Sequence, residues 1–364
     1  MNNLATFFKG KTILITGHTG FKGSWLSEIL FRWGAQVVGL SLAPHTQPSM
    51  FKILNIEEKV KSYIGDINDS KLLKEIFQRE KPEIVFHLAA QPLVRESYDD
   101  PIYTFNTNAL GTARVLQGIK EISCVKAAVM ITTDKVYENK RGETIYREDD
   151  ELGGHDPYST SKACAEFIIR SYVRSFFNPN EFGKKHSTLI CSARAGNVIG
   201  GGDWSKDRLM PDIIRAFLES NETLIIRNPQ AVRPWQHVLE PLTGYLILAK
   251  ELYQKNQTAI GGWNFASNPD SFVKVETIVQ KAQKIFNKGD YKIINDNNKH
   301  EATILKLDAT KAKEKLNWHP ILNIDENLNW TFEWYKRFYS GENMELFTQN
   351  QISYFFLRLE HDRA

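Results

Sequence analysis

A tyrosine and a lysine four residues apart, Tyr158 and Lys162, have the types and spacing that alcohol oxidation requires. Residues four apart on a helix lie on one face, so the phenol and the ammonium would be neighbours. The positive charge favours the phenolate and lowers a phenol pKa that is otherwise about 10. Such a phenol can take the proton of a sugar hydroxyl while a hydride leaves the same carbon. A solvated face of an amphipathic helix is the alternative interpretation, because the spacing alone is common.

Three polar residues, Thr133, Asp134 and Lys135, stand at the end of an apolar run over residues 126–133. The run predicts a buried strand, and doubly wound sheets bind their ligands at the carboxyl ends of such strands. Thr133 can supply the hydroxyl that holds the substrate oxygen. We therefore predict a catalytic site made of these three residues with Tyr158 and Lys162. Asp134 and Lys135 could instead form a simple surface ion contact.

A glycine-rich loop at the other end of the same domain predicts a bound dinucleotide. The β-branched run Thr12–Thr16 leads directly into this loop, and residues 24–33 then predict a helix. In this arrangement the glycines let the backbone approach a pyrophosphate, which sits on the helix amino terminus. A plain glycine-rich turn is the alternative. The predicted contacts from the loop are Gly17, Thr19, Gly20, Phe21, Lys22 and Gly23, of which Lys22 could reach a phosphate or face water.

The next strand, residues 36–40, lacks the acidic residue that NAD-binding domains usually place at its end, about 20 residues after the glycines. Leu40 is followed by Ser41 and Leu42, and the next carboxylate is Glu57. No arginine stands there to hold a 2′-phosphate either. The sequence thus predicts that a dinucleotide binds, but it gives weaker grounds for deciding which dinucleotide that is.

Later strand ends supply the other predicted cofactor contacts. Residues 63–67 end one strand, where Asp66 could accept a hydrogen bond from an adenine amine. Residues 83–90 predict the following strand, whose small carboxyl end would let a cofactor lie close, and His87 within it is interpreted as a core histidine. The predicted contacts outside the glycine loop are Ser41, Asp66, Ile67, Leu88, Ala89, Ala90, Asn108, Tyr158 and Lys162.

The regular alternation of strands and helices lapses after residue 195, which indicates a second unit that holds the substrate. We predict a Rossmann-type α/β domain with a doubly wound parallel sheet over residues 1–195 and 236–262, and a smaller mixed α/β lobe over residues 196–235 and 263–364. Several arginines could bind a diphosphate, which matches the guanidinium fork, or could simply face solvent. The predicted substrate contacts are Gln91, Arg95, Arg194, Asn197, Arg208, Arg233 and Trp235.

The composition agrees with a soluble enzyme and argues against several other classes of protein. The 364 residues are 42% hydrophobic and 24% charged, and a net charge of +3, evenly spread, argues against nucleic-acid binding. No apolar run approaches the ~18 residues that a membrane span needs, and residues 1–11 show no signal-peptide pattern. Three cysteines, odd in number and far apart, are typical of reduced thiols in the cytoplasm and predict neither a disulfide framework nor a metal site.

Together these motifs resemble the extended short-chain dehydrogenase/reductase family. The resemblance rests on the Gly-x-x-Gly-x-x-Gly loop, on Leu88-Ala89-Ala90, Thr107-Asn108, Thr133, Tyr158/Lys162 and Arg194, and on a late Leu307-Asp308-x-x-Lys311-Ala312 pattern. It spans most of the chain and implies bound NAD and a nucleotide-sugar substrate. It also implies a homodimer, in which the helices holding Gly111 and Lys162 pair with their copies in a four-helix bundle.

Within the family, the Thr133-Asp134-Lys135 triplet is most similar to nucleotide-sugar 4,6-dehydratases, and with the glycine loop and residues 201–204 it implies CDP-glucose as substrate. By this resemblance Tyr158, aided by Lys162 and Thr133, takes the C4 hydroxyl proton. Asp134 protonates the leaving C6 hydroxyl, and Lys135 removes the C5 proton. Lys135 stands where dTDP-glucose dehydratases carry a glutamate, and a lysine is a base only when neutral.

Three alternatives stay open at this point. A UDP-N-acetylglucosamine dehydratase can carry the same Thr-Asp-Lys triplet. A nucleotide-sugar 4-epimerase needs the Tyr158/Lys162 pair but has no use for an acid at Asp134. A catalytically silent dinucleotide-sensing protein would need neither member of the pair, so the intact pair favours an enzyme.

Overall fold

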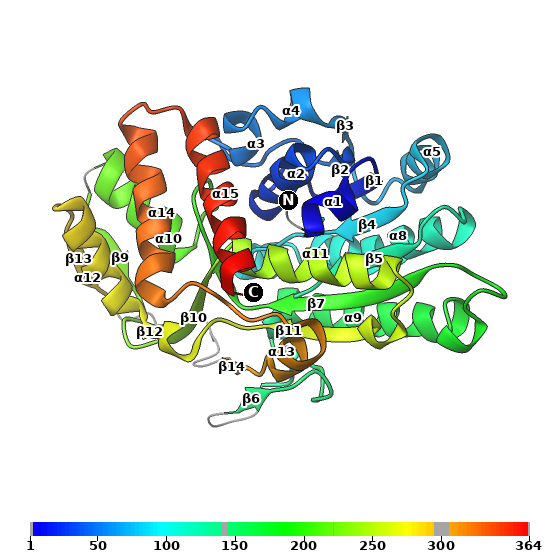
Figure 1. Ribbon diagram of the computed structural model, residues 1–364. Coiled ribbons are helices and arrows are strands. Elements are labelled where there is room, and N and C mark those ends of the chain that lie inside the picture. Colours follow the sequence, from blue (N-terminus) through cyan, green and yellow to red (C-terminus); the bar gives the residue numbers. More distant parts are fainter. Residues whose placement is uncertain (1–2, 140–143, 221, 295–305, 363–364) are drawn as a thin grey trace.

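Seven parallel strands form the sheet around which the chain is arranged (Figure 1). The computed structural model describes residues 3–139, 144–220, 222–294 and 306–362. The strand order is β11-β7-β5-β4-β1-β2-β3, so the chain winds outward in both directions from the boundary between β1 and β4, where doubly wound sheets bind ligands. The predicted fold class is confirmed. The strands are β1 (Thr12–Thr16), β2 (Gln36–Ser41), β3 (Lys61–Ile64), β4 (Ile84–His87), β5 (Ala127–Ile131), β7 (Leu189–Ala195) and β11 (Gly261–Phe265).

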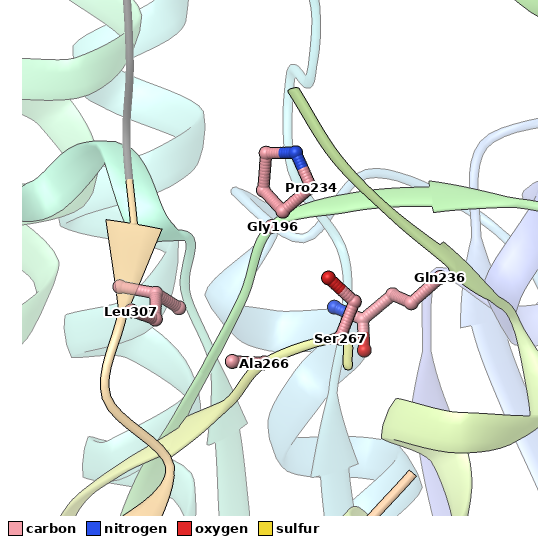
Figure 2. Close-up of a pocket in the computed structure, with 6 residues that line it drawn as sticks. All are labelled: Gly196, Pro234, Gln236, Ala266, Ser267 and Leu307. Carbon is pink, nitrogen blue, oxygen red and sulfur yellow. The ribbon is translucent and has the colours of Figure 1, made fainter. Parts of the chain in front are cut away.

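A smaller lobe of short strands and helices stands beside the carboxyl edge of this sheet. Its main sheet has the order β12-β10-β8, and two further strand pairs are β13-β9 and β14-β6. Where the lobe meets the end of β7, a narrow pocket is lined by Gly196, Pro234, Gln236, Ala266, Ser267 and Leu307 (Figure 2). The strands are β6 (Ile145–Tyr146), β8 (Asn197–Ile199), β9 (Leu224–Ile226), β10 (Val232–His237), β12 (Phe272–Lys274), β13 (Tyr291–Ile293) and β14 (Lys306–Leu307).

Two of the predicted domain boundaries fall inside strands. β10 continues to His237 and pairs with β8 through its last three residues, so residues 236 and 237 belong to the lobe sheet. β11 pairs with β7 along its whole length, so the large sheet extends to residue 265, past the predicted boundary at 262. A strand ends where its hydrogen-bonded ladder ends, and composition does not reveal that point.

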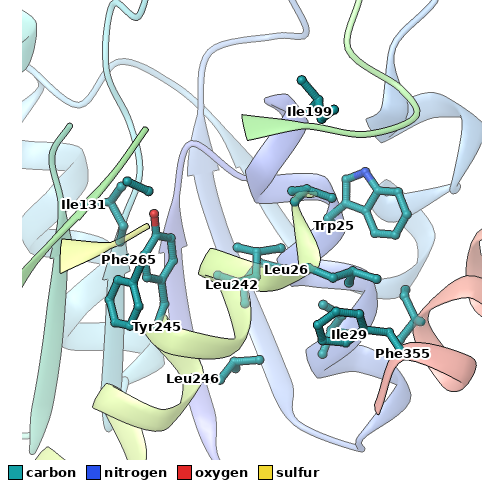
Figure 3. Close-up of a cluster of buried hydrophobic side chains, with 14 of the residues drawn as sticks. Trp25, Leu26, Ile29, Ile131, Ile199, Leu242, Tyr245, Leu246, Phe265 and Phe355 are labelled. Carbon is teal, nitrogen blue, oxygen red and sulfur yellow. The ribbon is translucent and has the colours of Figure 1, made fainter. Parts of the chain in front are cut away.

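Helices cover both faces of the large sheet because alternate residues of a buried strand point to opposite sides. Ile13 and Ile15 of β1 belong to one apolar cluster, and Leu14 belongs to another. Figure 3 shows part of the first cluster, in which side chains of α2 lie beside those of α11. The helices of the first cluster include α1 (Asn3–Phe8), α2 (Phe21–Arg32) and α11 (Leu239–Tyr253), and those of the second are α5 (Ser70–Glu80), α8 (Gly111–Glu121) and α9 (Pro157–Phe176).

One helix of the second face contains a wide turn. α7 (Pro101–Phe105) starts where the Asp100 side chain accepts the N–H of Tyr103, and it runs into the π-helical turn η1 (Asn106–Leu110) and then into α8. Single π turns inside helices are frequent at functional sites. Here the turn contains Asn108, which is fully buried and faces α9.

Two long helices near the carboxyl end join the lobe to the first domain. α15 (Met344–Asp362) packs against α14 (Ile324–Tyr339) and also reaches the α2 layer, where the rings of Phe356 and Trp33 are 4.8 Å apart (Figure 1). The aromatic tail predicted to pack on the body or on a partner therefore packs on the body through Phe355 and Phe356. None of the described helices has the length and apolar character to cross a membrane. The remaining α-helices are α3 (Met50–Ile53), α4 (Ile56–Lys59), α6 (Val94–Asp99), α10 (Leu209–Ile214), α12 (Val275–Phe286) and α13 (Thr310–Leu316).

Candidate active site

The predicted catalytic residues come from two elements that converge at the carboxyl edge of the sheet. β5 leads to Thr133, which caps the 3-10 turn Asp134–Val136 and donates a hydrogen bond to the Asp134 carboxylate at 3.0 Å. Tyr158 lies in the first turn of α9, where Asp156 caps the helix by accepting the Ser159 N–H at 2.9 Å. The structure therefore brings the turn after β5 and the start of α9 together, as the sequence predicts.

Burial controls the protonation of the Tyr158/Lys162 pair. It raises the pKa of Tyr158 to about 12, although a hydrogen bond with Thr133 and the charge of Arg208 act in the opposite direction. Burial also lowers the pKa of Lys162 to about 8, and Glu166 partly offsets this effect. The Lys162 ammonium donates to the Ile131 carbonyl at 3.2 Å. The predicted net lowering of the Tyr158 pKa is therefore wrong for the ligand-free protein, because desolvation outweighs the favourable charges.

Asp134 has the surroundings that a general acid needs. Burial raises the pKa of its carboxyl group, and the charges of Lys135, Arg233 and Lys22 and the hydrogen bond from Thr133 only partly counter this effect. A carboxyl group with a raised pKa can carry a proton and donate it. Lys22 also interacts with Lys162 and Arg208, and its own pKa is lowered to about 8, chiefly by burial. The cation of the glycine loop thus lies on the catalytic side of the loop.

The three loop glycines serve different purposes. Gly17 has a φ of +81°, and a Cβ there would lie 2.7 Å from the Ala89 nitrogen, so the loop packs directly on the residues after β4. A Cβ on Gly23 would lie 2.1 Å from the Gly17 oxygen, which allows no side chain between the loop and α2. Gly20 is the N-cap of α2 without a side-chain cap, and its nearest neighbour would be 3.4 Å away. Pyrophosphate binding requires a tight turn, close packing of the loop on the helix, and open space for the anion. Gly17, Gly23 and Gly20 meet these three requirements in that order.

The other predicted cofactor contacts lie at the ends of adjacent strands. Ser41 ends β2, where its hydroxyl is 2.7 Å from that of Thr19, and Thr19 also donates to the Leu42 carbonyl. Two hydroxyls thus stand where a carboxylate usually holds the ribose. Asp66 follows β3 and accepts the Asn68 N–H at 2.8 Å. By strand order, the residues at the same sheet edge are Gly17, Ser41, Asp66, Ile67, Leu88, Ala89 and Ala90.

The structure corrects the predicted role of Arg194. It is fully buried, and its guanidinium donates to both oxygens of Glu166 at 2.8 Å and to the Tyr137 hydroxyl at 2.7 Å. It has no exposed atoms with which to bind a substrate diphosphate. An arginine at a strand end looks the same in sequence whether it pairs inward or outward. Glu166, four residues after Lys162 on the same helix face, is the signal that could have identified the inward pairing.

Three other predicted contacts also belong to the interior. The Gln91 amide bonds to Thr104 and to both backbone groups of Leu93, which shapes the loop after β4. Asn108 bridges that loop to α9, accepting the Gln91 N–H at 2.8 Å and donating to Ser161 at 2.9 Å. Trp235 is buried in the lobe core, where its indole N–H donates a hydrogen bond to a backbone carbonyl of β12. Gln91 and Trp235 are therefore structural, and Asn108 holds the catalytic helix in place.

The remaining predicted arginines surround the junction of domain and lobe. Arg208 pairs with Asp203 at 2.8 Å and acts electrostatically on Tyr158. Arg95 of α6 pairs across the junction with Asp207 at 3.6 Å, and Arg233 interacts with Asp134. These positive groups suit a diphosphate. Asp203, which orients Arg208, is a site residue that the predictions omitted, although the glycine-rich run before it marks the loop.

The narrow pocket of Figure 2 adjoins the catalytic turn. Gly196 lines this pocket, and a Cβ built on it would lie only 3.2 Å from the Asp134 carboxylate. Because glycine has no side chain, the carboxyl group lies close to the pocket wall. Asn197 follows on β8, in register with Trp235. His87, in contrast, is a satisfied core residue as predicted, with its ring nitrogens 2.7 Å from Thr16 and 3.0 Å from Thr112. Within the described part of the chain, no three potential ligand residues gather to hold a metal ion.

Comparisons with known proteins identify the family of the chain. Residues 14–331 match the family model described as GDP-mannose 4,6 dehydratase. The chain is 47% identical to a CDP-glucose 4,6-dehydratase from Salmonella typhimurium, covering 95% of this chain and 96% of that protein. It is 30% identical to a dTDP-D-glucose 4,6-dehydratase from Dictyostelium discoideum, covering 76% and 64%.

Solved structures show the same fold. One is DesIV, a dTDP-glucose 4,6-dehydratase from Streptomyces venezuelae with NAD and TYD bound, with a TM-score of 0.77, 21% identity and coverage of 90% of this chain and 97% of that one. Another is a UDP-glucose 4-epimerase from Thermotoga maritima with UDP-glucose, with a TM-score of 0.74, 23% identity and coverage of 90% and 99%. Dehydratases and epimerases thus share this architecture, so the fold alone does not distinguish them.

The burial of Lys162 predicts a stability gain when its charge is removed. Below a pH of about 8 both folded and unfolded chains carry the proton, and the folded protein bears the full cost of burying it. Between about 8 and the ordinary value of 10.5 only the unfolded chain stays protonated, so stability rises with pH. We expect Lys162→Met to be more stable than the parent by about 1–2 kcal/mol at pH 7 in thermal unfolding. The difference should shrink at pH 10, and a larger gain at pH 10 would contradict this account.

The different surroundings of Gly20 and Gly23 predict that substituting one weakens cofactor binding, whereas substituting the other destabilises the fold. Gly20→Ala has an extended backbone and open space, so its free energy of unfolding should stay within about 1 kcal/mol of the parent. Its methyl group would occupy the anion approach, and calorimetric titration should show NAD affinity reduced about tenfold or more. Gly23→Ala is the contrasting variant, because its Cβ meets backbone and should destabilise the fold itself. Unreduced affinity in folded Gly20→Ala would place the pyrophosphate elsewhere.

Proposed function

The chain belongs to the GDP-mannose 4,6-dehydratase family of extended short-chain dehydrogenases/reductases, and from this membership we propose that it is a CDP-glucose 4,6-dehydratase with NAD as cofactor. The resemblance drawn from the motifs is confirmed by the family match. The reaction converts CDP-D-glucose to CDP-4-dehydro-6-deoxy-D-glucose and water. The observation that carries the proposal is the buried Asp134, an acid placed beside the tyrosine that would accept the C4 hydroxyl proton.

The glycine loop and its neighbours hold the cofactor. The uncapped amino terminus of α2 suits the pyrophosphate, and the hydroxyls of Thr19 and Ser41 suit the adjacent ribose. Bound there, NAD would supply the acceptor for the hydride of the sugar C4 and the donor that returns it to C6, so that no net NAD is consumed. The cationic charge that NAD would bring to the site has the sign that lowers the pKa of Tyr158 from about 12.

The side chains of α9 and of the turn after β5 divide the proton transfers between them. Tyr158 takes the proton of the C4 hydroxyl while Thr133, which is hydrogen-bonded to Tyr158, holds that oxygen. The role of the Lys162 ammonium in stabilising the phenolate follows from the family resemblance and from the shared face of α9. The resulting 4-ketone makes the C5 proton acidic. Lys135 removes this proton, and Asp134 protonates the C6 hydroxyl, which otherwise leaves poorly. The arginines at the junction, chiefly Arg208 and Arg233, bind the diphosphate.

Two enzyme alternatives and one binding alternative can be weighed against these residues. A 4-epimerase has no need for a buried acid with a raised pKa at Asp134. A silent dinucleotide sensor has no need for Tyr158 and Lys162 to be buried together. A UDP-N-acetylglucosamine dehydratase would use the same residues, and the identity of 47% to a CDP-glucose enzyme favours CDP-glucose over it.

The substrate is tested by comparing sugar nucleotides. The purified protein with added NAD is incubated with CDP-glucose, dTDP-glucose, UDP-glucose and UDP-N-acetylglucosamine, and 4-keto-6-deoxy product is measured. We expect kcat/KM for CDP-glucose to exceed the others by about tenfold or more, ~1.4 kcal/mol in transition-state binding. Preference for another sugar nucleotide, or stoichiometric release of NADH, would overturn the assignment.

Asp134→Asn should separate oxidation from elimination. The amide cannot protonate the C6 hydroxyl, so the variant should oxidise bound CDP-glucose once and accumulate bound NADH, visible by its absorbance. Tyr158→Phe blocks the first step and should form no NADH, with a rate loss on the order of 10²–10⁴-fold. Asp290→Asn, an exposed carboxylate, is the control and should behave as the parent does. Release of product by Asp134→Asn at the parent rate would show that another group supplies the proton.

We also propose that the protein is a homodimer in which α9 and the continuous helix formed by α7, η1 and α8 pair with their copies. Apolar side chains are exposed along them, with Ile102 at 78%, Leu110 at 51% and Phe167 at 52% of full exposure. Exposed apolar groups gathered on one face favour association. We expect Leu110→Asp/Phe167→Asp to elute as a monomer in size-exclusion chromatography with light scattering, while Leu346→Asp on α15 leaves the parent state unchanged. A monomeric parent protein would refute the dimer.

A cytoplasmic location stays a proposal supported by the three cysteines, each of which is a free thiol. Fractionation of cells that produce the protein would test it.

A further inference from the structure

A buried carboxylate, Glu166, lies beneath the active site and has no role in the proposed proton transfers. Its oxygen atoms accept four hydrogen bonds: Thr132 at 2.6 Å and Arg194 Nε at 2.8 Å reach Oε1, and Ser192 and Arg194 Nη2, each at 2.8 Å, reach Oε2. Burial alone would raise the pKa of Glu166, but the Arg194 charge and these hydrogen bonds outweigh burial and lower it. Glu166 is therefore an ionised group whose hydrogen-bonding capacity is filled.

The remaining nitrogen of the Arg194 guanidinium, Nη1, also has hydrogen-bond partners. Its Nη1 donates to the Tyr137 hydroxyl at 2.7 Å and to the Glu148 carbonyl at 3.1 Å. The neighbouring strand β11 makes room for it with a glycine, because a Cβ on Gly262 would lie 2.7 Å from Nη2. The pair is thus enclosed between β7, β11, α9 and the segment that follows the catalytic turn.

The partners of this pair stand on both sides of the catalytic turn. Thr132 directly precedes Thr133 and bonds to Glu166, while Tyr137 directly follows the turn and bonds to Arg194. Glu166 itself lies one helical turn after Lys162 on the same face of α9. One ion pair therefore connects both ends of the turn to the helix that carries Tyr158 and Lys162.

We propose that the Glu166–Arg194 pair is a positioning device that keeps Asp134 at a set distance from Tyr158. Resting on the proposed dehydratase reaction, the inference is that the pair serves elimination more than oxidation. Oxidation relies chiefly on Tyr158 and Lys162, which a single helix holds together, with Thr133 at the start of the turn as an aid. Elimination needs Asp134, which lies inside the turn, to reach the same sugar. A misplacement of about 1 Å can cost on the order of 100-fold in rate. Loosening the turn should therefore affect the second step selectively.

Two mild substitutions loosen the turn while the ion pair stays intact. Thr132→Val removes one donor to Glu166, and Tyr137→Phe removes one acceptor from Arg194. Thr188→Val is the matched control, because Thr188 is also buried and donates to a carbonyl at 2.7 Å, but it lies at the amino end of the sheet. All variants are compared with the parent in single turnovers with saturating NAD and CDP-glucose.

We expect the double variant Thr132→Val/Tyr137→Phe to oxidise CDP-glucose within about threefold of the parent rate and to form 4-keto-6-deoxy product about 10–100-fold more slowly. Bound NADH should accumulate in this variant and not in Thr188→Val. Equal slowing of both steps, or of neither, would overturn the positioning role.

A second measurement needs no substrate and separates this inference from the proposed function. Amide hydrogen exchange at residues 134–137 of the ligand-free protein should be about tenfold faster in the double variant and unchanged in Thr188→Val. Unchanged exchange in the double variant would also refute the positioning role, whatever the sugar. A parent enzyme that does not act on CDP-glucose would count against the proposed function alone.

Discussion

The active site of this protein depends on keeping ionisable side chains in place where water is excluded. Burying a charge is costly unless a partner offsets the lost hydration. Arg194 offsets that cost for Glu166, the Ile131 carbonyl accepts from Lys162, and Thr133 donates to Asp134. The same burial sets the protonation that the chemistry uses. Packing and catalysis therefore rest on one set of contacts, and this explains why β5, β7 and α9 converge at a single point of the sheet edge.

The cofactor helix and the substrate loop share a common support. A Cβ on Gly201 would lie 2.0 Å from the Trp334 ring, and the Asp203 N–H is accepted by the Tyr335 hydroxyl at 2.9 Å, so α14 holds the loop that positions Arg208. On its other side, α15 pairs Glu345 with Lys59 at 2.7 Å, next to α2. The helix pair α14–α15 therefore braces both proposed ligand sites, one at the glycine loop and the other at the loop that carries Arg208.

Local patterns predicted the fold and the candidate catalytic residues that the structure brings together, whereas long-range pairing could not be predicted. The glycine loop and the Tyr158/Lys162 spacing have local physical requirements, so they were identified from neighbouring residues alone. Arg194 was misassigned because its partner is 28 residues away and only the fold brings them together. The pKa of Tyr158 was misjudged for a related reason, since helix spacing reveals a nearby charge but not the depth of burial. The absence of an acid after β2 is visible in the sequence, and so are the candidate contacts Thr19 and Ser41, whereas the hydrogen bond between their two hydroxyls is not.

The contact between α15 and α2 has a consequence for how the protein is made. Gln349 donates to Glu28 across 321 residues of chain, and the edge strand β11 also comes late in the sequence. A ribosome adds about 5–20 residues per second, so α2 emerges on the order of tens of seconds before the segments that cover it. Until residues 344–362 have been synthesised, the apolar surface that α15 covers stays open to chaperones and to other unfinished chains. The glycine loop and α2 are thus translated long before the segments that cover them.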